Sequence, residues 1–219
     1  MNLDNKQNPN TQKFWEEKLR GVLAVQAHDF ITKSRIDEVV KLIPNKELNL
    51  LDVGVGYGFL ENAINRYRPE SKMIGIDITP ANLTAIRNRV RGSFVVGTAS
   101  SLPLRQRQFD AVCILEVLEH LYFKEAQKAL EESMRVLKSD GILIISVPLF
   151  DKPYDGHPSG HVREITPNQI IQEVNNAGFI VKKTISLVAF RSHYNLKTLI
   201  NKILPLRKPN NLIIGAIKK

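Results

Sequence analysis

Cysteine is scarce in this sequence, in which Cys113 is the only one among 219 residues. A single cysteine excludes a disulfide within the chain and is typical of proteins from a reducing compartment. The sequence also has no apolar run long enough to cross a bilayer, and its polar start, Met1 to Gln12, does not resemble a secretory signal peptide. We therefore expect a soluble, cytoplasmic protein that folds around an ordinary hydrophobic core.

Acidic residues are absent after Glu173. The chain beyond it carries nine bases, whereas residues 1–173 hold the other 22 bases and all 22 acids, so the C-terminal part supplies the whole net charge of +9. Such an asymmetry predicts a basic face toward an anionic partner, such as RNA, lipid headgroups or a phosphorylated substrate. A solvated basic surface without a partner is the alternative.

The chain does have one concentrated glycine motif, at residues 50–58. An apolar run ends in Asp52 and is followed by three alternate glycines, Gly54, Gly56 and Gly58. A strand, a glycine turn and a helix together form a ligand cradle, because glycine lets a ligand approach the backbone and the helix N-terminus presents N–H groups. Phe59 stands where the dinucleotide fingerprint G-x-G-x-x-G needs its last glycine, which disfavours an NAD-dependent oxidoreductase.

The spacing Asp52-x-Gly54-x-Gly56-x-Gly58 instead resembles the first motif of class I S-adenosyl-L-methionine (SAM) methyltransferases. The similarity extends over about residues 48–219 and is strongest to methyltransferase type 11 and to ubiquinone–menaquinone biosynthesis methyltransferases. It implies SAM as the cofactor and S-adenosyl-L-homocysteine as the product. The residues that the resemblance assigns to cofactor binding are Asp52, Gly54, Gly56, Gly58, Asp77, Ile78, Thr98, Ala99, Leu115 and Glu116.

For two of these positions the side chain suggests which part of SAM it would bind. Asp77 ends the second predicted strand, where a carboxylate can accept hydrogen bonds from both ribose hydroxyls. Thr98 lies in Gly97 to Leu104, which resembles the family's adenine loop, but it stands where that loop usually has an acid. A hydroxyl can still hydrogen-bond to the adenine amino group, although without the charge.

The apolar pattern and the resemblance together predict an α/β fold. The expected sheet is doubly wound, Rossmann-like and seven-stranded, mostly parallel with an antiparallel last strand, in the order 3-2-1-4-5-7-6. Strands are expected at residues 48–53, 72–77, 93–96, 109–115, 142–147, 179–188 and 211–217. Helices are expected over residues 80–90, from Ala126 to a stop at Asp140-Gly141, and from an N-cap at Thr166 to Gly178.

The domain organisation follows from the same patterns. Residues 1–12 are polar and expected to be disordered, and residues 13–219 form the methyltransferase domain. Within it, residues 13–46 are expected to form helices that cap the substrate side. Residues 190–209 are expected to form an inserted amphipathic helix with only positive charges, which either packs on the sheet edge or contacts an anionic membrane.

The stretch Glu116-Val117-Leu118-Glu119-His120 follows the fourth predicted strand, where a doubly wound sheet places its reactive groups. His120 is the candidate catalytic base, and a structural role in the turn is the alternative. If this turn is helical, Glu116, Glu119 and His120 share one face. Methyltransferases that act on small-RNA 3′ ends use a similar pattern, together with a distant histidine, to bind a divalent metal. In this sequence His157 or His161 would be that histidine. We nevertheless expect no metal here.

The favoured function is the transfer of a methyl group to an oxygen, nitrogen or carbon atom of a small-molecule or lipid-precursor acceptor. An RNA methyltransferase is a second hypothesis, which the basic C-terminal part supports but which lacks an aromatic stacking module. A catalytically silent SAM-binding protein is a third. The sequence does not identify the acceptor, the acceptor atom or the oligomeric state.

Overall fold

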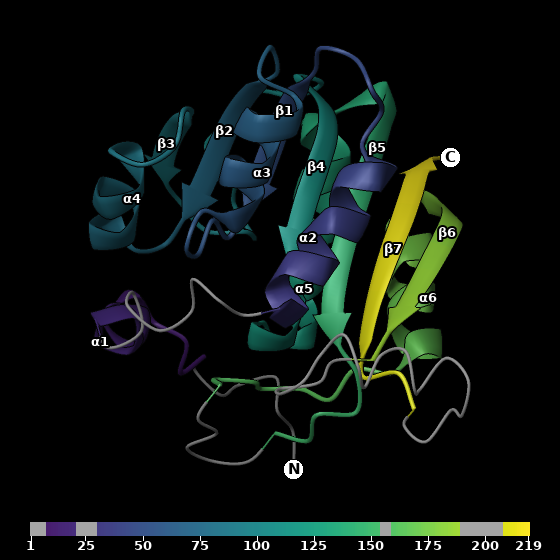
Figure 1. Ribbon diagram of the computed structural model, residues 1–219. Coiled ribbons are helices and arrows are strands. Elements are labelled where there is room, and N and C mark those ends of the chain that lie inside the picture. Colours follow the sequence, from purple (N-terminus) through teal and green to yellow (C-terminus); the bar gives the residue numbers. More distant parts are fainter. Residues whose placement is uncertain (1–7, 21–29, 154–158, 189–207) are drawn as a thin grey trace.

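A computed structural model describes residues 8–20, 30–153, 159–188 and 208–219 of the chain. Its centre is a seven-stranded sheet in the order β3-β2-β1-β4-β5-β7-β6 (Figure 1). All neighbouring strands from β3 to β5 are parallel, and β7 is antiparallel to both β5 and β6. The strands are β1 (Asn49–Val53), β2 (Lys72–Asp77), β3 (Ser93–Val96), β4 (Phe109–Leu115), β5 (Leu137–Pro148), β6 (Phe179–Leu187) and β7 (Asn211–Lys218).

Helices cover both faces of the sheet. Figure 1 shows α2 (Phe30–Leu42) and α3 (Phe59–Tyr67) in front of the strands, and α5 (Phe123–Val136) and α6 (Pro167–Asn176) behind them. Helix α4 (Pro80–Arg87) lies beside β3, and α1 (Gln12–Arg20) lies near α4, below the carboxyl ends of the parallel strands. The predicted doubly wound fold and its strand order are therefore confirmed.

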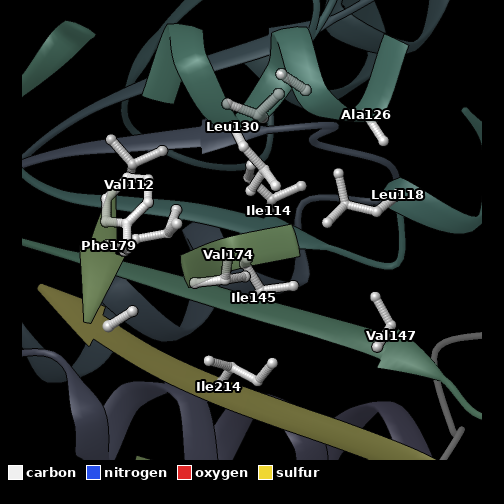
Figure 2. Close-up of a cluster of buried hydrophobic side chains, with 14 of the residues drawn as sticks. Val112, Ile114, Leu118, Ala126, Leu130, Ile145, Val147, Val174, Phe179 and Ile214 are labelled. Atoms are coloured by element: carbon white, nitrogen blue, oxygen red, sulfur yellow. The ribbon is translucent and has the colours of Figure 1, made fainter. Parts of the chain in front are cut away.

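The core follows from the apolar pattern of the strands, because alternate residues of a strand face opposite sides of the sheet. One cluster lies between the sheet and α5 and α6, with Ile114, Leu130 and Phe179 among its fully buried members (Figure 2). A second cluster lies beneath α2 and α3 and includes Leu50 and Cys113. The two clusters therefore pack both faces of β1 and β4 in the middle of the sheet.

Several boundaries differ from the sequence-based expectations. The helix expected to run to Asp140-Gly141 ends at Val136, and β5 begins directly at Leu137 and continues through that pair. This stretch forms a strand and does not continue the helix, because Leu137 pairs with Phe109 at the start of β4. Helix α4 ends at Arg87 rather than at residue 90. The N-cap at Thr166 is confirmed, since its side chain accepts a hydrogen bond from the Gln169 N–H.

The expectations for residues 1–12 and 190–209 can be compared with the structure only in part, because the structure describes only some of these residues. In the expected disordered stretch, residues 8–12 are described and make contacts, which are detailed below. The expected inserted helix at residues 190–209 lies outside the described residues except for Lys208 and Pro209. Within the described parts of the chain, no helix combines the length and apolar character needed to span a bilayer.

Candidate functional site

The glycine turn between β1 and α3 has the backbone that its sequence predicts. Gly54, Gly56 and Gly58 have φ values of +89°, +53° and +76°, all in the left-handed region. A Cβ atom at Gly54 would also collide with the side chain of Val117, so the turn lies directly against the end of β4. Any other residue would strain this turn, because side chains disfavour positive φ. Of the three glycines, Gly56 has free space where a Cβ atom would be, since the nearest atom there is the Gly54 carbonyl oxygen at 3.9 Å.

Asp77 and Asn82 fix this turn from the neighbouring strand and helix. One Asp77 oxygen, Oδ2, accepts a hydrogen bond from the Gly56 N–H at 3.1 Å, and the other, Oδ1, accepts from the Thr79 N–H at 2.9 Å and from its hydroxyl. The Asn82 amide donates to the Gly56 carbonyl and contacts Asp77 Oδ2 at 3.4 Å. Asp77 is thus both a candidate ribose acceptor and a brace of the glycine turn.

A second acidic group lies beneath the same turn. Asp52, at the end of β1, and Glu61, in the first turn of α3, are 2% and 0% exposed. Burial raises the pKa of Asp52 well above its ordinary value, with a further increase from the charge of Glu61. Burial likewise raises the pKa of Glu61 to about 7. Cys113 is the partner of Asp52 in the β1–β4 register, and burial raises the pKa of its thiol well above the ordinary value.

The other residues assigned to the cofactor also lie along this edge. Ile78, Ala99 and Leu115 are partly buried, and Thr98 is exposed in the short loop that it closes with Ser101. These residues follow or end β2, β3 and β4, whose parallel pairing brings their carboxyl ends to one edge. All ten residues assigned to cofactor binding therefore lie in the glycine turn or at the carboxyl ends of the four neighbouring strands β1–β4.

Glu116 has an unusual backbone and a dense set of partners. Its φ is +55°, a conformation that costs a non-glycine residue about 1–3 kcal/mol and is concentrated at functional sites. Its carboxylate accepts hydrogen bonds from Ser146 Oγ at 2.9 Å and from Asn211 Nδ2 at 3.0 Å. Arg35 of α2 forms an ion pair with its other oxygen at 3.1 Å. β5, β7 and α2 therefore all orient this one side chain.

This geometry corrects the expectation that Glu116, Glu119 and His120 share a helical face. The chain is extended to Leu115, turns sharply at Glu116, and then forms only the short 3₁₀ helix η3 (Leu118–His120). Glu116 is directed to Ser146 and Asn211, whereas Glu119 is buried. The left-handed turn at Glu116 separates it from the other two residues.

The His120 ring has a defined proton position. Its Nδ1 lies 3.1 Å from the carbonyl oxygen of Gly160, which can only accept, so Nδ1 carries the hydrogen. In the neutral ring the lone pair is therefore on Nε2, which lies 3.8 Å from Glu119 Oε1. Trp15 of α1 packs edge-on against the ring with a centroid distance of 4.7 Å. His120 thus has the tautomer that a general base needs, under an aromatic cover.

Asparagine side chains just before α1 connect the N-terminal stretch to the His120 turn. The side chains of Asn8 and Asn10 both donate to the backbone carbonyl of His120, at 3.0 and 2.9 Å. Asn10 also donates to the Gly160 carbonyl at 2.8 Å, and it is only 9% exposed. The N-terminal stretch therefore joins the His120 turn to the loop that holds its ring.

Glu119, His120 and His161 form a compact group whose potential ligand atoms all lie within 4.8 Å of one another. Burial raises the pKa of Glu119 well above its ordinary value and Glu116 raises it further, while Arg35 and Arg163 lower it. The histidine and carboxylate atoms are of the types that bind divalent transition metals. Of the two distant histidines considered from the sequence, His161 lies in this group and His157 lies outside the described residues.

Several polar residues of this region carry no motif that the sequence analysis could use. Arg163 donates from Nε to the Leu118 carbonyl at 3.0 Å and pairs through Nη1 with both oxygens of the buried Glu173, at 2.8 and 2.9 Å. The sequence analysis also did not identify Arg35 and Glu61 as residues of this region. Glu61 had one signal, since an acid interrupts the apolar face that Leu60 and Ile64 give to α3.

One large open hollow, of about 620 Å³, lies at the opposite edge of the sheet. It is lined by residues at the amino ends of β1 to β4, including Asn49, Lys72 and Ser93. The glycine turn, Asp77 and His120 are not part of it. The hollow is therefore separate from the candidate site.

Comparisons with known proteins match the same part of the chain. Residues 51–145 match the model of a family described as a methyltransferase domain. The chain is similar to the demethylmenaquinone methyltransferase of Thermotoga maritima, with 30% identity over 114 residues, covering 52% of this chain and 48% of the relative. It is also similar to a ubiquinone biosynthesis O-methyltransferase of Azorhizobium caulinodans, with 32% identity over 48% of this chain and 42% of the relative. The matches thus span about half the length of these relatives.

Solved structures share the fold over nearly the whole chain. The 1,6-didemethyltoxoflavin N1-methyltransferase of Burkholderia thailandensis, crystallised with bound 1,6-didemethyltoxoflavin and S-adenosylhomocysteine, has a TM-score of 0.72 and 19% identity over 95% of this chain and 87% of that one. A methyltransferase from Haloferax volcanii in complex with the Trm112 activator has a TM-score of 0.73 and 16% identity over 97% of both chains. At these identities the likeness shows the fold.

Proposed function

We propose that this protein, whose residues 51–145 belong to the methyltransferase domain family, binds SAM at the glycine turn and transfers its methyl group to a small-molecule or lipid-precursor acceptor. The observation that carries the proposal is the turn itself, in which three glycines with positive φ lie between Asp52 and Asp77 at the carboxyl edge of the sheet. Carboxyl edges of doubly wound sheets are where such folds bind their ligands.

The residues present fit the chemistry of SAM. Its positive charges, on the sulfonium and the amino group, suit a site with Asp52 and Asp77, since opposite charges attract most strongly where water is excluded. Asp77 offers carboxylate oxygens to ribose hydroxyls, and the exposed Thr98 offers a hydroxyl to the adenine amino group. Bound SAM supplies an activated methyl group, so the protein need only align the acceptor and remove its proton where it has one.

We assign the proton-accepting role to His120. The Gly160 carbonyl keeps the hydrogen on Nδ1, so Nε2 can accept a proton from an acceptor hydroxyl or ammonium. Trp15 covers the ring and helps to exclude water from it. The acceptor would then lie between η3, α1 and the loop after β5. The quinone-pathway relatives support a small, largely apolar acceptor.

The test begins with SAM and S-adenosylhomocysteine binding by calorimetry. Asp77→Asn keeps the shape of the side chain and removes its charge, and we expect about 10–100-fold weaker binding, as for the loss of hydrogen bonds to a charged group. Asp140→Asn, at an exposed position of β5, is the matched control and should bind like the native protein. Unchanged affinity in Asp77→Asn would refute the assignment of this residue.

The second half of the test addresses the acceptor. Labelled SAM is incubated with pools of quinone precursors, other small phenols and amines, and RNA, each with and without a chelator. Transfer to a small molecule is the expected result. Transfer to RNA, or SAM binding without any transfer, would instead support one of the two other functions considered from the sequence.

A further inference from the structure

The buried carboxyl pair of Asp52 and Glu61 lies directly beneath the glycine turn. Asp52 precedes Gly54 by two residues, and Glu61 follows Gly58 by three. Asp52 Oδ1 and both oxygens of Glu61 are fully buried and have no hydrogen-bond donor among the described residues. Buried polar atoms are nearly always paired, so three such oxygens in one place need an explanation.

A shared proton supplies part of that explanation. The two carboxyls lie near enough for the charge of Glu61 to raise the pKa of Asp52. Ionised carboxylates are acceptors only, so a hydrogen bond between the two requires that one group keeps its proton. Like charges in one buried site raise the pKa of one partner, as in the paired carboxyls of aspartic proteases. Two buried carboxyls placed in this way favour one shared proton on the pair.

The surroundings of the pair favour this protonated state. Asp77 of β2 is a third carboxyl group nearby, and its negative charge raises the pKa of both members. Cys113 of β4 faces the pair as a thiol, because burial raises its pKa and Asp52 and Glu61 raise it further. The packing on the other sides is apolar, from residues such as Leu50, Leu60 and Ile64. A positive charge that arrived at this position would reverse the balance, because it stabilises the ionised form of both carboxyls.

We propose that Glu61 belongs to the cofactor site, and that the Asp52–Glu61 pair releases its shared proton to solvent when the positively charged methionine part of SAM binds over the glycine turn. Only an O–H bond breaks, the proton passes to water or buffer, and both carboxylates remain to face the cation. This inference rests on the proposed function. It adds that cofactor binding is coupled to a proton, through a residue that is separate from the glycine motif.

The experiment measures protons directly. SAM and, separately, S-adenosylhomocysteine are titrated into the full chain at pH 6, 7 and 8, in two buffers with different heats of ionisation. We expect the native protein to release up to one proton at pH 6 and little at pH 8. Accordingly, SAM affinity should fall by up to tenfold per pH unit as the pH drops below about 7.

The amino group of the ligand also ionises near neutral pH, so proton release by the protein must be distinguished from proton release by the ligand. Variants of the carboxyl pair make this distinction. Glu61→Gln replaces the acid with an amide of the same shape that can donate to Asp52, and it should lose the proton release and its pH dependence. Glu131→Gln, at an exposed position of α5, is the matched control and should behave as the native protein. If Glu61→Gln does not fold, Asp52→Asn removes the other half of the pair and should also lose the proton release.

Each outcome decides one question. If SAM binds to the native chain without proton release at pH 6, or if both variants still release the native number, the coupling is refuted while the proposed function stands. If neither SAM nor S-adenosylhomocysteine binds at any pH, the proposed function itself fails.

Discussion

At the scale of single residues, this protein concentrates buried polar groups at the carboxyl edge of the parallel strands. Glu116 has a left-handed backbone and is held by Ser146, Asn211 and Arg35. His120 is held through Nδ1 by a backbone carbonyl. Strained or buried polar residues with specific partners are typical of functional sites, because structural stability alone does not require them.

The role proposed for His120 leads to a prediction about rates. His120→Ala should lower kcat by about 10²–10⁴-fold for an acceptor that must lose a proton, since this is the usual contribution of a general base. The dissociation constant of SAM should stay within about twofold, because His120 is not among the residues assigned to the cofactor. Rates at saturating SAM and calorimetric titrations measure the two quantities.

A structural role for His120 would give a different pattern. The Trp15 ring packs on this histidine and Asn10 donates to its carbonyl, so a collapsed turn should reduce stability and SAM affinity together. His120→Gln, which retains a hydrogen-bonding group but is no base at neutral pH, should restore any lost stability and leave kcat low. Recovery of kcat in that variant would contradict the role as a base.

At the scale of elements, polar and aromatic contacts attach the N-terminal helix to the rest of the described chain. Its junction with the rest of the protein includes the amides of Asn8 and Asn10, the edge-on contact of Trp15 with His120, and Lys18 near Glu119. Partial burial lowers the pKa of Lys18, while the Glu119 charge raises it. An element held by a few polar contacts opens at lower free energy than the core.

This attachment can be followed by fluorescence, because Trp15 is the only tryptophan of the chain. Asn10→Ala removes two hydrogen bonds at a nearly buried position and should cost about 1–3 kcal/mol of docking free energy. We expect red-shifted Trp15 emission and stronger quenching by acrylamide, with little change in the main thermal transition. Asn62→Ala, at an exposed position of α3, is the control. Native emission in Asn10→Ala would show that the amide contacts do not hold the helix.

At the scale of the whole molecule, buried acids determine how stability varies with pH. Burial raises the pKa of Asp52, Glu61 and Glu119 in the folded state, so between the unfolded and folded pKa values the folded state binds more protons. The free energy of unfolding therefore falls as the pH rises from about 4.5 to 7. Asp110 and Glu132 act in the opposite direction, because hydrogen bonds from Lys138 and Arg135 help to lower their pKa values, and their contribution is lost in acid.

These opposing effects predict maximal thermal stability at roughly pH 5. Glu61→Gln should raise the melting temperature at pH 8 and leave it nearly unchanged at pH 5, where Glu61 is already neutral. Thermal unfolding followed by circular dichroism from pH 4 to pH 9 checks the curve, with Glu131→Gln as the control. A melting temperature that rises steadily from pH 5 to pH 8 would contradict the protonated state of these acids.

Most of the fold was determined by local sequence pattern. Apolar runs of strand length, the N-cap at Thr166 and the alternate glycines each act over a few residues, so the elements could be identified without tertiary information. The strand order, including the antiparallel last strand, followed from a resemblance carried by the same short motifs. Among the element ends that differed, the one at Val136 is where sheet pairing of Leu137 overrides helical periodicity.

The composition of the site was decided by tertiary structure. Asp52 and the glycines form one motif and Asp77 ends the next strand, but Glu61 comes near Asp52 only because α3 packs back on the sheet. Arg35 reaches Glu116 only because α2 packs on the sheet face at β5 and β7. The contacts of Asn10 with Gly160 join residues 150 positions apart. Long-range polar contacts carry no periodic signal in the sequence, because a side chain's partner and its pKa depend on what the fold brings beside it.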